Sequence, residues 1–412
     1  MTSSVSRLFK SNLPAPAAAV FKAFPQYNFI GGHNDGQTLP LDAMAEAASK
    51  MMLAHGRDLA TYNMQSGPQG FRPLREFIAK QLSSSCGLTD NPDQVMITSG
   101  SMQALDLVNA LLLEPGDVVI AEEASYAGAI SRIRKTGATC LGVRLDEHGI
   151  DTDHLAAMLT EQRAAGRTVK YIYTIPTVQN PTGTVLPLKR RERLIELASE
   201  YDCLIFEDDC YAELLWQGER PPAIRALDKA QDGARRVIYC GSFSKSLAPA
   251  LRVGYLAADW TILAQMISLK SDAGSGSLEQ MMLAEFCSQH FDQHIQALRP
   301  VLKEKCALMM SALRESFGDQ AQFAEPSGGI FIWITLPDHV DTTHLAQLAL
   351  QQGLAINPGA DWTVDGAANR HRLRLCFGHP TEQTIREGVA LLATLCSEAF
   401  DLTLPSTTSC RQ

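Results

Sequence analysis

Short apolar runs alternate with helix-like segments through the middle of the chain. The runs lie at residues 95–98, 117–121, 140–143, 170–174, 203–206 and 237–240. Segments with helical periodicity, such as 102–113 and 189–200, separate most of these runs. Strands that alternate with helices are typical of an open, doubly wound sheet with helices on both faces. We therefore predict an α/β fold with a mostly parallel sheet.

The pattern changes beyond Leu278. A long helical stretch at 278–317 leads to apolar runs at 328–334 and 372–377, and an amphipathic helix at 381–399 follows. Because 412 residues are too many for one simple core, this change predicts a second, smaller α+β domain. The expected division is 1–45 for an N-terminal arm and part of the small domain, 46–285 for the large domain and 286–412 for the small C-terminal domain.

Composition argues against two classes of partner. With 45% hydrophobic and 20% charged residues, the chain has the composition of a globular protein. A formal net charge of −9 argues against a nucleic-acid-binding surface. No apolar run approaches the roughly 18 residues that a membrane helix needs. We therefore expect neither nucleic acid nor membrane as a partner.

The cysteines and the N-terminus bear on location. Ten cysteines are scattered from Cys86 to Cys410 without a Cys-x-x-Cys pair, which is typical of reduced thiols in a cytoplasmic protein. The first 34 residues lack Asp and Glu and contain Arg7, Lys10 and Lys22. Such a segment is either a transit peptide or an irregular arm, and we favour the arm.

Lys245 follows one of the apolar runs and precedes another, at 253–257. We predict that it lies on a short polar loop at the carboxyl end of a buried strand, where open α/β sheets place ligands. A lysine amine can form a Schiff base with an aldehyde cofactor. The hydroxyls of Ser242 and Ser244 and the guanidinium of Arg252 suit a phosphate. For this loop alone, an exposed lysine in a Ser-rich turn is the plain alternative.

Polar turns follow other runs as well. Ser101 and Met102 open a helix after a strand, and free N–H groups there bind anions, although Gly-Ser also makes an ordinary cap. Tyr126 follows the next strand, where an aromatic ring either stacks on a flat ligand or simply packs. Asn180 begins an Asn-Pro-x-Gly turn, a sequence that is common in isolation.

Together these motifs carry a resemblance to a known superfamily. Ser242-Phe-Ser-Lys245, followed by Leu251-Arg-Val-Gly254, resembles the cofactor segment of fold-type I pyridoxal-phosphate (PLP) enzymes. Over nearly the whole chain, the sequence is similar to class I aminotransferases of the aminoadipate and kynurenine type. The same fold forms the effector domain of MocR-type regulators. The resemblance implies a mostly parallel seven-stranded sheet and PLP as the cofactor.

The resemblance also implies roles for individual residues. Lys245 carries the cofactor and acts as the catalytic base and acid. Tyr126 stacks on the pyridine ring, Asp208 holds its nitrogen, and Asn180 and Tyr211 bond its phenolic oxygen. The expected phosphate ligands are Ser101, the backbone of Met102, Ser242, Ser244 and Arg252.

Substrate binding is expected at Arg374, Gly32 and Asn180. A guanidinium can hold a carboxylate with two parallel hydrogen bonds, and the Leu-Arg-Leu-x-Phe frame selects Arg374 over Arg370 and Arg372. The resemblance places Gly32 against the same carboxylate, although the glycine pair there also suits a plain turn.

One position departs from the family pattern. The family forms homodimers with composite active sites, and a tyrosine on the entry loop reaches the partner's cofactor phosphate. Here that position is Gln65. Either Gln65 or the nearby Tyr62 takes over the phosphate contact, or the changed loop reshapes the substrate pocket. We favour the first.

The resulting hypothesis is a PLP-dependent aminotransferase that moves an amino group from an amino acid to a 2-oxo acid, 2-oxoglutarate, by a ping-pong mechanism. One alternative is another PLP reaction, such as elimination, cyclisation or oxidation of an unusual amino acid, because fold does not fix reaction. The other is a ligand-sensing domain of a MocR-type regulator, but the residues before Gly31 contain no helix-turn-helix pattern.

Overall fold

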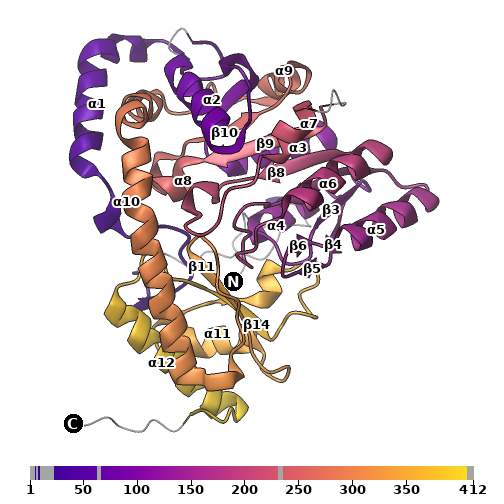
Figure 1. The fold of residues 1–412 in the computed structure, drawn as a ribbon, viewed down its shortest axis with the longest axis vertical. Helices are drawn as coiled ribbons and strands as arrows, with labels where there is room; N and C mark the ends of the chain where they lie inside the picture. Colours follow the sequence, from indigo (N-terminus) through magenta and orange to yellow (C-terminus); the bar gives the residue numbers. More distant parts are fainter. Residues whose placement is uncertain (1–4, 6–7, 10–22, 63–65, 231–234, 406–412) are drawn as a thin grey trace.

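The computed structural model describes residues 5, 8–9, 23–62, 66–230 and 235–405 (Figure 1). The position at Gln65 and most of the expected N-terminal arm lie outside these residues. Among the described residues, no helix combines the length and the apolar character needed to cross a bilayer.

A seven-stranded sheet forms the centre of the molecule, in the order β2-β10-β9-β8-β7-β3-β4. Only β10 runs antiparallel to its neighbours, and the other pairs are parallel. This confirms the predicted, mostly parallel seven-stranded sheet. The strands are β2 (Val95–Thr98), β3 (Val118–Glu122), β4 (Thr139–Val143), β7 (Val169–Thr174), β8 (Leu204–Asp208), β9 (Val237–Ser242) and β10 (Gly254–Ala257).

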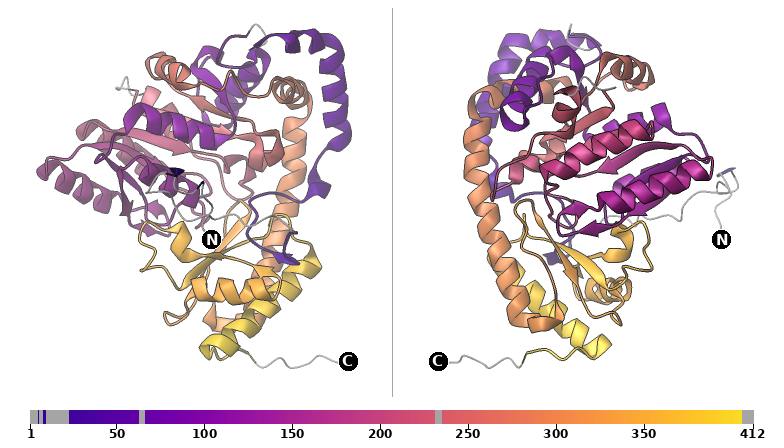
Figure 2. Two further views of the ribbon diagram at one scale, coloured as in Figure 1. Left: turned by 180° about the vertical axis from the view of Figure 1, so that it is seen from behind. Right: turned by 45° about the vertical axis from the view of Figure 1, so that its right-hand side comes forward.

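Helices cover both faces of this sheet (Figure 2). Successive side chains of a strand point to opposite faces. In β3, Val119 belongs to the cluster that includes α3, α4 and α9, whereas Val118 and Ile120 pack with α5, α6 and α7. The covering helices are α3 (Ser101–Leu112), α4 (Ala127–Lys135), α5 (Thr152–Ala164), α6 (Leu188–Glu200), α7 (Ile224–Ala230) and α9 (Trp260–Leu269).

A smaller α+β unit follows the sheet. Its antiparallel sheet has the order β11-β14-β13, and β1 pairs in parallel with β12, which brings the start of the described chain to this unit. Its elements are β11 (Phe331–Thr335), β13 (Asn357–Pro358), β14 (Arg372–Cys376), β1 (Tyr27–Asn28), β12 (Leu354–Ala355), α11 (Thr342–Gln351) and α12 (Glu382–Phe400).

One long helix links the two parts. α10 (Ser277–Phe317) runs beside the large sheet and continues to the small unit (Figure 1). The expected domain boundary after residue 285 falls inside this continuous helix. Outside the large sheet, α1 (Leu41–His55) and α2 (Arg72–Cys86) pack against the first part of α10. A short hairpin of β5 (Leu145–Asp146) and β6 (Gly149–Ile150) lies near β4.

Candidate active site

A cavity of about 110 Å³ lies where β7, β8 and β9 end, at the carboxyl edge of the parallel strands. It brings together nine of the residues predicted from the sequence and three that were not predicted, Ile175, Cys210 and Pro249. The predicted nine are Ser101, Met102, Tyr126, Asn180, Asp208, Tyr211, Ser244, Lys245 and Arg252. Residues from distant parts of the sequence meet here because parallel strands end at one edge of their sheet.

The segment that carries Lys245 is a short helix, α8 (Phe243–Ser246), and the prediction of a loop was wrong. The Ser242 hydroxyl caps this helix by accepting from the N–H of Ser244 at 3.1 Å, and the cap makes a single helical turn possible. Ser242 itself is not among the residues that line the cavity.

The Lys245 amine contacts Gly32, one of the residues predicted to bind substrate. Its Nζ donates to the carbonyl oxygen of Gly32 at 2.6 Å. Burial lowers the pKa of Lys245, and the positive charge of Arg374 acts in the same direction. A lowered pKa increases the fraction of neutral amine, which is the form that acts as a nucleophile and as a base.

An anion cradle lies at the start of α3. Gly100 has φ +79°, and a Cβ at this position would lie 2.5 Å from the Nη2 atom of Arg252. Arg252 donates to the carbonyl oxygen of Ser99 at 3.2 Å, which holds its guanidinium beside the helix N-terminus. Backbone N–H groups at a helix start, a serine hydroxyl and a guanidinium suit a phosphate group.

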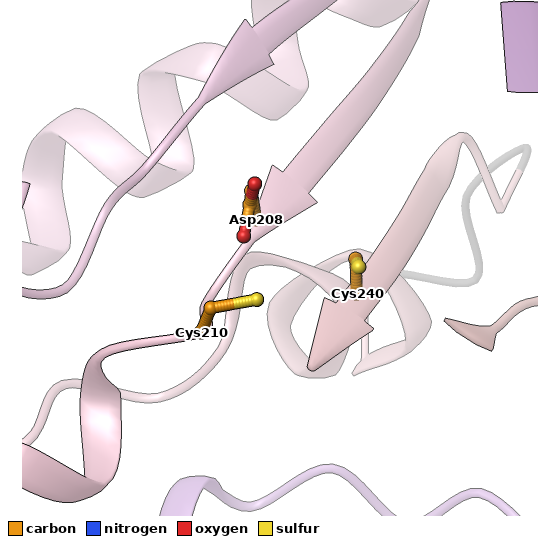
Figure 3. Close-up of side chains that lie close together, drawn as sticks. All are labelled: Asp208, Cys210 and Cys240. Atoms are coloured by element: carbon orange, nitrogen blue, oxygen red, sulfur yellow. The ribbon is translucent and has the colours of Figure 1, made fainter. Parts of the chain in front are cut away.

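Asp208 lines the same cavity at the end of β8. Its Oδ2 accepts from the Tyr173 hydroxyl at 2.6 Å. Burial raises the pKa of Asp208, while hydrogen bonds from Tyr173 and the Cys210 thiol lower it. Figure 3 shows Asp208 with Cys210 and Cys240. A carboxylate oxygen of Asp208 and the Sγ atoms of the two cysteines all lie within 4.8 Å of one another. Hydrogen bonds from Tyr173 and Cys210 thus hold the Asp208 carboxyl in place.

Asn180 connects two parts of the site. Its Nδ2 donates to the Tyr211 hydroxyl at 3.2 Å, and its Oδ1 accepts from Arg374 at 3.0 Å. The Asn180–Pro181 peptide bond is cis. The one side chain therefore contacts both the predicted cofactor residues and the predicted substrate arginine.

Arg374 lies between two aromatic rings. Its guanidinium carbon is 3.5 Å from the ring centroid of Trp362 and 3.7 Å from that of Phe331. One Nη donates to Asn180 and the other to the carbonyl oxygen of Ile30 at 3.3 Å. The buried Nε has no hydrogen-bond partner among the described residues.

Arg374 is a cation at neutral pH despite its burial. Burial lowers its pKa to about 10, so the guanidinium is still a cation at neutral pH. A buried donor without a partner is costly, and such donors are usually satisfied by a ligand or by water. The unpartnered Nε is consistent with an anionic ligand at this end of the site.

Several residues of the site carried no recognisable sequence signal. Tyr173 was part of a predicted strand, and only strand pairing brings it to Asp208. Phe331 was part of a predicted apolar run and Trp362 was not singled out, and nothing local marks them as neighbours of Arg374.

A lysine after a strand of a mostly parallel seven-stranded sheet, in one cavity with an anion cradle and a buried carboxylate, defines a fold-type I PLP enzyme. The family model for aminotransferases of class I and II matches residues 28–392. The chain therefore belongs to the class I and II aminotransferase family, whose cofactor is PLP.

The chain is similar to individual aminotransferases and also to a transcriptional regulator. The chain is 34% identical to a 2-aminoadipate transaminase of Thermus thermophilus, over 89% of this chain and 88% of the relative. Its fold is similar to the crystal structure of a kynurenine aminotransferase of Pyrococcus horikoshii, with a TM-score of 0.88 and 32% identity over 96% and 98% of the two chains. An HTH-type transcriptional regulator of Bacillus subtilis is 30% identical over 89% of this chain and 73% of the regulator.

Proposed function

We propose that this aminotransferase moves the amino group of an α-amino acid to 2-oxoglutarate by a ping-pong mechanism. The observation that carries the proposal is Arg374, a buried cation with an unpartnered Nε. Asn180 joins Arg374 to the cavity that Lys245 lines. A carboxylate bound at this arginine would place the neighbouring α-carbon of an amino acid or oxo acid toward the lysine.

The predicted residues of the cavity then have roles toward the cofactor. PLP, when bound, supplies an electron sink for charge left on the substrate's α-carbon. The carboxylate of Asp208 holds a proton at the pyridine nitrogen, and Asn180 and Tyr211 donate to the phenolic oxygen. Tyr126 covers one face of the ring.

The anion cradle would hold the cofactor phosphate. The hydroxyls of Ser101 and Ser244, the N–H of Met102 and the guanidinium of Arg252 are the proposed ligands. Ser242 was expected among them, but its hydroxyl bonds that of Ser244 at 3.0 Å. We propose that Ser242 acts on the phosphate by orienting Ser244.

Lys245 would move the proton. Its neutral amine takes the proton from the substrate's α-carbon and returns it later in the cycle, acting as a general base and then as a general acid. Its contact with the Gly32 carbonyl places the amine beside the segment expected to contact the substrate carboxylate.

The test is incubation with a panel of amino acids, with and without 2-oxoglutarate. The panel includes 2-aminoadipate and kynurenine because similar proteins are named for them. We expect mass spectrometry to show a 2-oxo acid and glutamate, and absorbance to follow the cofactor between its two forms. An eliminated, cyclised or oxidised product would overturn transamination in favour of a specialised PLP reaction.

We also propose a homodimer with composite active sites. Apolar side chains along one segment of the described chain are exposed, and a second copy would cover them. These are Leu41, Met52, Leu53, Leu59 and Tyr62, with exposed fractions of 62%, 42%, 87%, 39% and 83%. Light scattering at assay concentration should give the mass of a dimer, and a catalytically active monomer would refute the proposal.

The thiols support a cytoplasmic location, which we propose as well. Nine cysteines in the described residues are free and buried, as in a protein kept in a reducing compartment. Cell fractionation with an antibody to the chain tests this, and recovery from an organelle lumen would contradict it.

A further inference from the structure

Glu122 is a buried carboxylate that lies behind the cavity wall. It is the last residue of β3, its side chain is 2% exposed, and it does not line the cavity. Its Oε1 accepts from the Thr174 hydroxyl at 2.8 Å and from the N–H of Ile175 at 3.0 Å. Its Oε2 accepts from Gln179 at 2.8 Å and from the Ser125 hydroxyl at 3.3 Å.

Gln179 extends this network. Its Nε2 donates both to Glu122 and to the carbonyl oxygen of Ala124 at 2.7 Å. Its Oε1 accepts from the backbone N–H and the hydroxyl of Thr182, at 2.8 and 2.7 Å. The amide group of this buried side chain is therefore fully used in hydrogen bonds that join different loops.

The pair ties together three segments of the cavity wall. The segment after β3 carries Tyr126, the segment after β7 carries Ile175, and the turn that follows carries Asn180. Asn180 in turn contacts Tyr211 and Arg374. A displacement of this turn would reach both the cofactor side and the carboxylate side of the site.

We propose that Glu122 and Gln179 are a positioning pair that fixes Tyr126 and Asn180 against the cofactor ring and, through Asn180, aligns Arg374 for the substrate carboxylate. The proposal rests on the functions proposed above for these three residues. It assigns Glu122 and Gln179 no contact with cofactor or substrate.

The charge of Glu122 matters for the network. Burial raises the pKa of Glu122 more than the hydrogen bonds from Gln179, Thr174, Ile175 and Ser125 lower it, and the balance leaves the pKa at about 7. An ionised carboxylate accepts all of these bonds, whereas a glutamine offers one accepting oxygen and an NH₂ group that faces other donors. Glu122→Gln is therefore a change of nearly equal shape that breaks the network.

Glu207 provides a matched control. It is a completely buried glutamate on the neighbouring strand β8, and burial together with the charge of Asp209 raises its pKa. Its oxygens accept from the N–H groups of Ile224 and Arg225 at 2.8 and 2.9 Å, at the start of α7. None of these partners lines the cavity. Glu207→Gln therefore removes a comparable buried charge whose hydrogen bonds hold the start of α7, outside the network of Glu122 and Gln179.

The experiment compares Glu122→Gln and Glu207→Gln with the unmodified enzyme, each below its measured unfolding temperature. PLP affinity is measured by fluorescence titration, and KM and kcat are measured for one amino donor. We expect Glu122→Gln to weaken PLP binding and to raise KM, each by about tenfold, the scale on which outer hydrogen-bond partners act at metal centres. Glu207→Gln should leave both within about twofold.

Equal effects of the two variants, or unchanged PLP affinity and KM in Glu122→Gln, would overturn the proposal. If Glu122→Gln does not fold, Gln179→Met takes its place, because it keeps the carboxylate and three of its donors. For Gln179→Met we expect the same loss of PLP affinity and the same rise in KM, and unchanged values would overturn the proposal. PLP affinity needs no amino donor, so a failure of the proposed transamination would leave this test valid.

Discussion

The two ends of the site are built in different ways. At the cofactor end, Ser101, Asp208 and Lys245 each lie at or just after the end of a strand of one sheet, and each lies in a short local motif. At the carboxylate end, Arg374 is held by Trp362 and Phe331, from separate segments of the small unit, together with groups from other parts of the chain.

This difference separates the binding of the cofactor from the binding of the substrate carboxylate. The cofactor end depends on the edge of a rigid parallel sheet, whereas the carboxylate end depends on how the small unit packs against it. If the proposed roles hold, substitutions at the cofactor end change PLP retention and turnover. Substitutions at the carboxylate end change the apparent affinity for substrate and leave PLP in place.

The largest effect is expected from Lys245→Ala at the cofactor end. Without the amine, the protein should lose its borohydride-reducible link to PLP, and turnover should fall by roughly 10³-fold or more because the proton-transfer group is gone. Borohydride treatment followed by mass spectrometry checks the link. A retained covalent cofactor would show that another residue carries it.

Asp208→Asn should come next. The fold should be retained, but the pyridine nitrogen loses its anionic partner, and turnover should drop by roughly 10²-fold or more while substrate KM changes little. Asp209→Asn is the neighbouring control, because Asp209 bonds Arg220 at 2.8 Å and does not line the cavity. Near-normal turnover in Asp208→Asn would remove Asp208 from the proposed role.

Arg374→Lys tests the carboxylate end. Lysine lacks the planar fork that holds a carboxylate with two bonds, so KM for the amino donor should rise by roughly 10- to 100-fold. PLP retention should stay the same, which sharpens the contrast between the two ends. Arg372→Lys, two residues earlier on β14, should have little effect. Loss of PLP from Arg374→Lys would mean that the two ends are not separable.

The smallest effect is expected at Gln65. If Gln65 contacts the partner's cofactor phosphate, Gln65→Ala should weaken PLP retention by about 1 kcal/mol, the size of one hydrogen bond, with the donor preference unchanged. Tyr62→Phe is the companion variant, because this exposed tyrosine can make the same contact. Full PLP retention with altered donors would place Gln65 in the substrate pocket and favour a specialised reaction.

The cofactor end could be predicted from the sequence because its signals are local. A β-type run that ends in a polar turn already places Asp208 or Lys245 at the sheet edge. The exceptions are small in scale: the Lys245 segment is a helical turn because Ser242 caps it, and this cap turns the Ser242 hydroxyl to Ser244.

By itself, the sequence determined the order of strands and helices, the family, and the residues that follow each strand, because hydrophobic periodicity and turn motifs act over a few residues. Only the tertiary structure decided which side chains became neighbours. Tyr173 reaches Asp208 because β7 and β8 pair in one register, and Glu122 joins the segments after β3 and β7 because these two strands pair side by side. Such partners are ordinary tyrosines and glutamates in the sequence, and only burial and pairing across long separations give them a role.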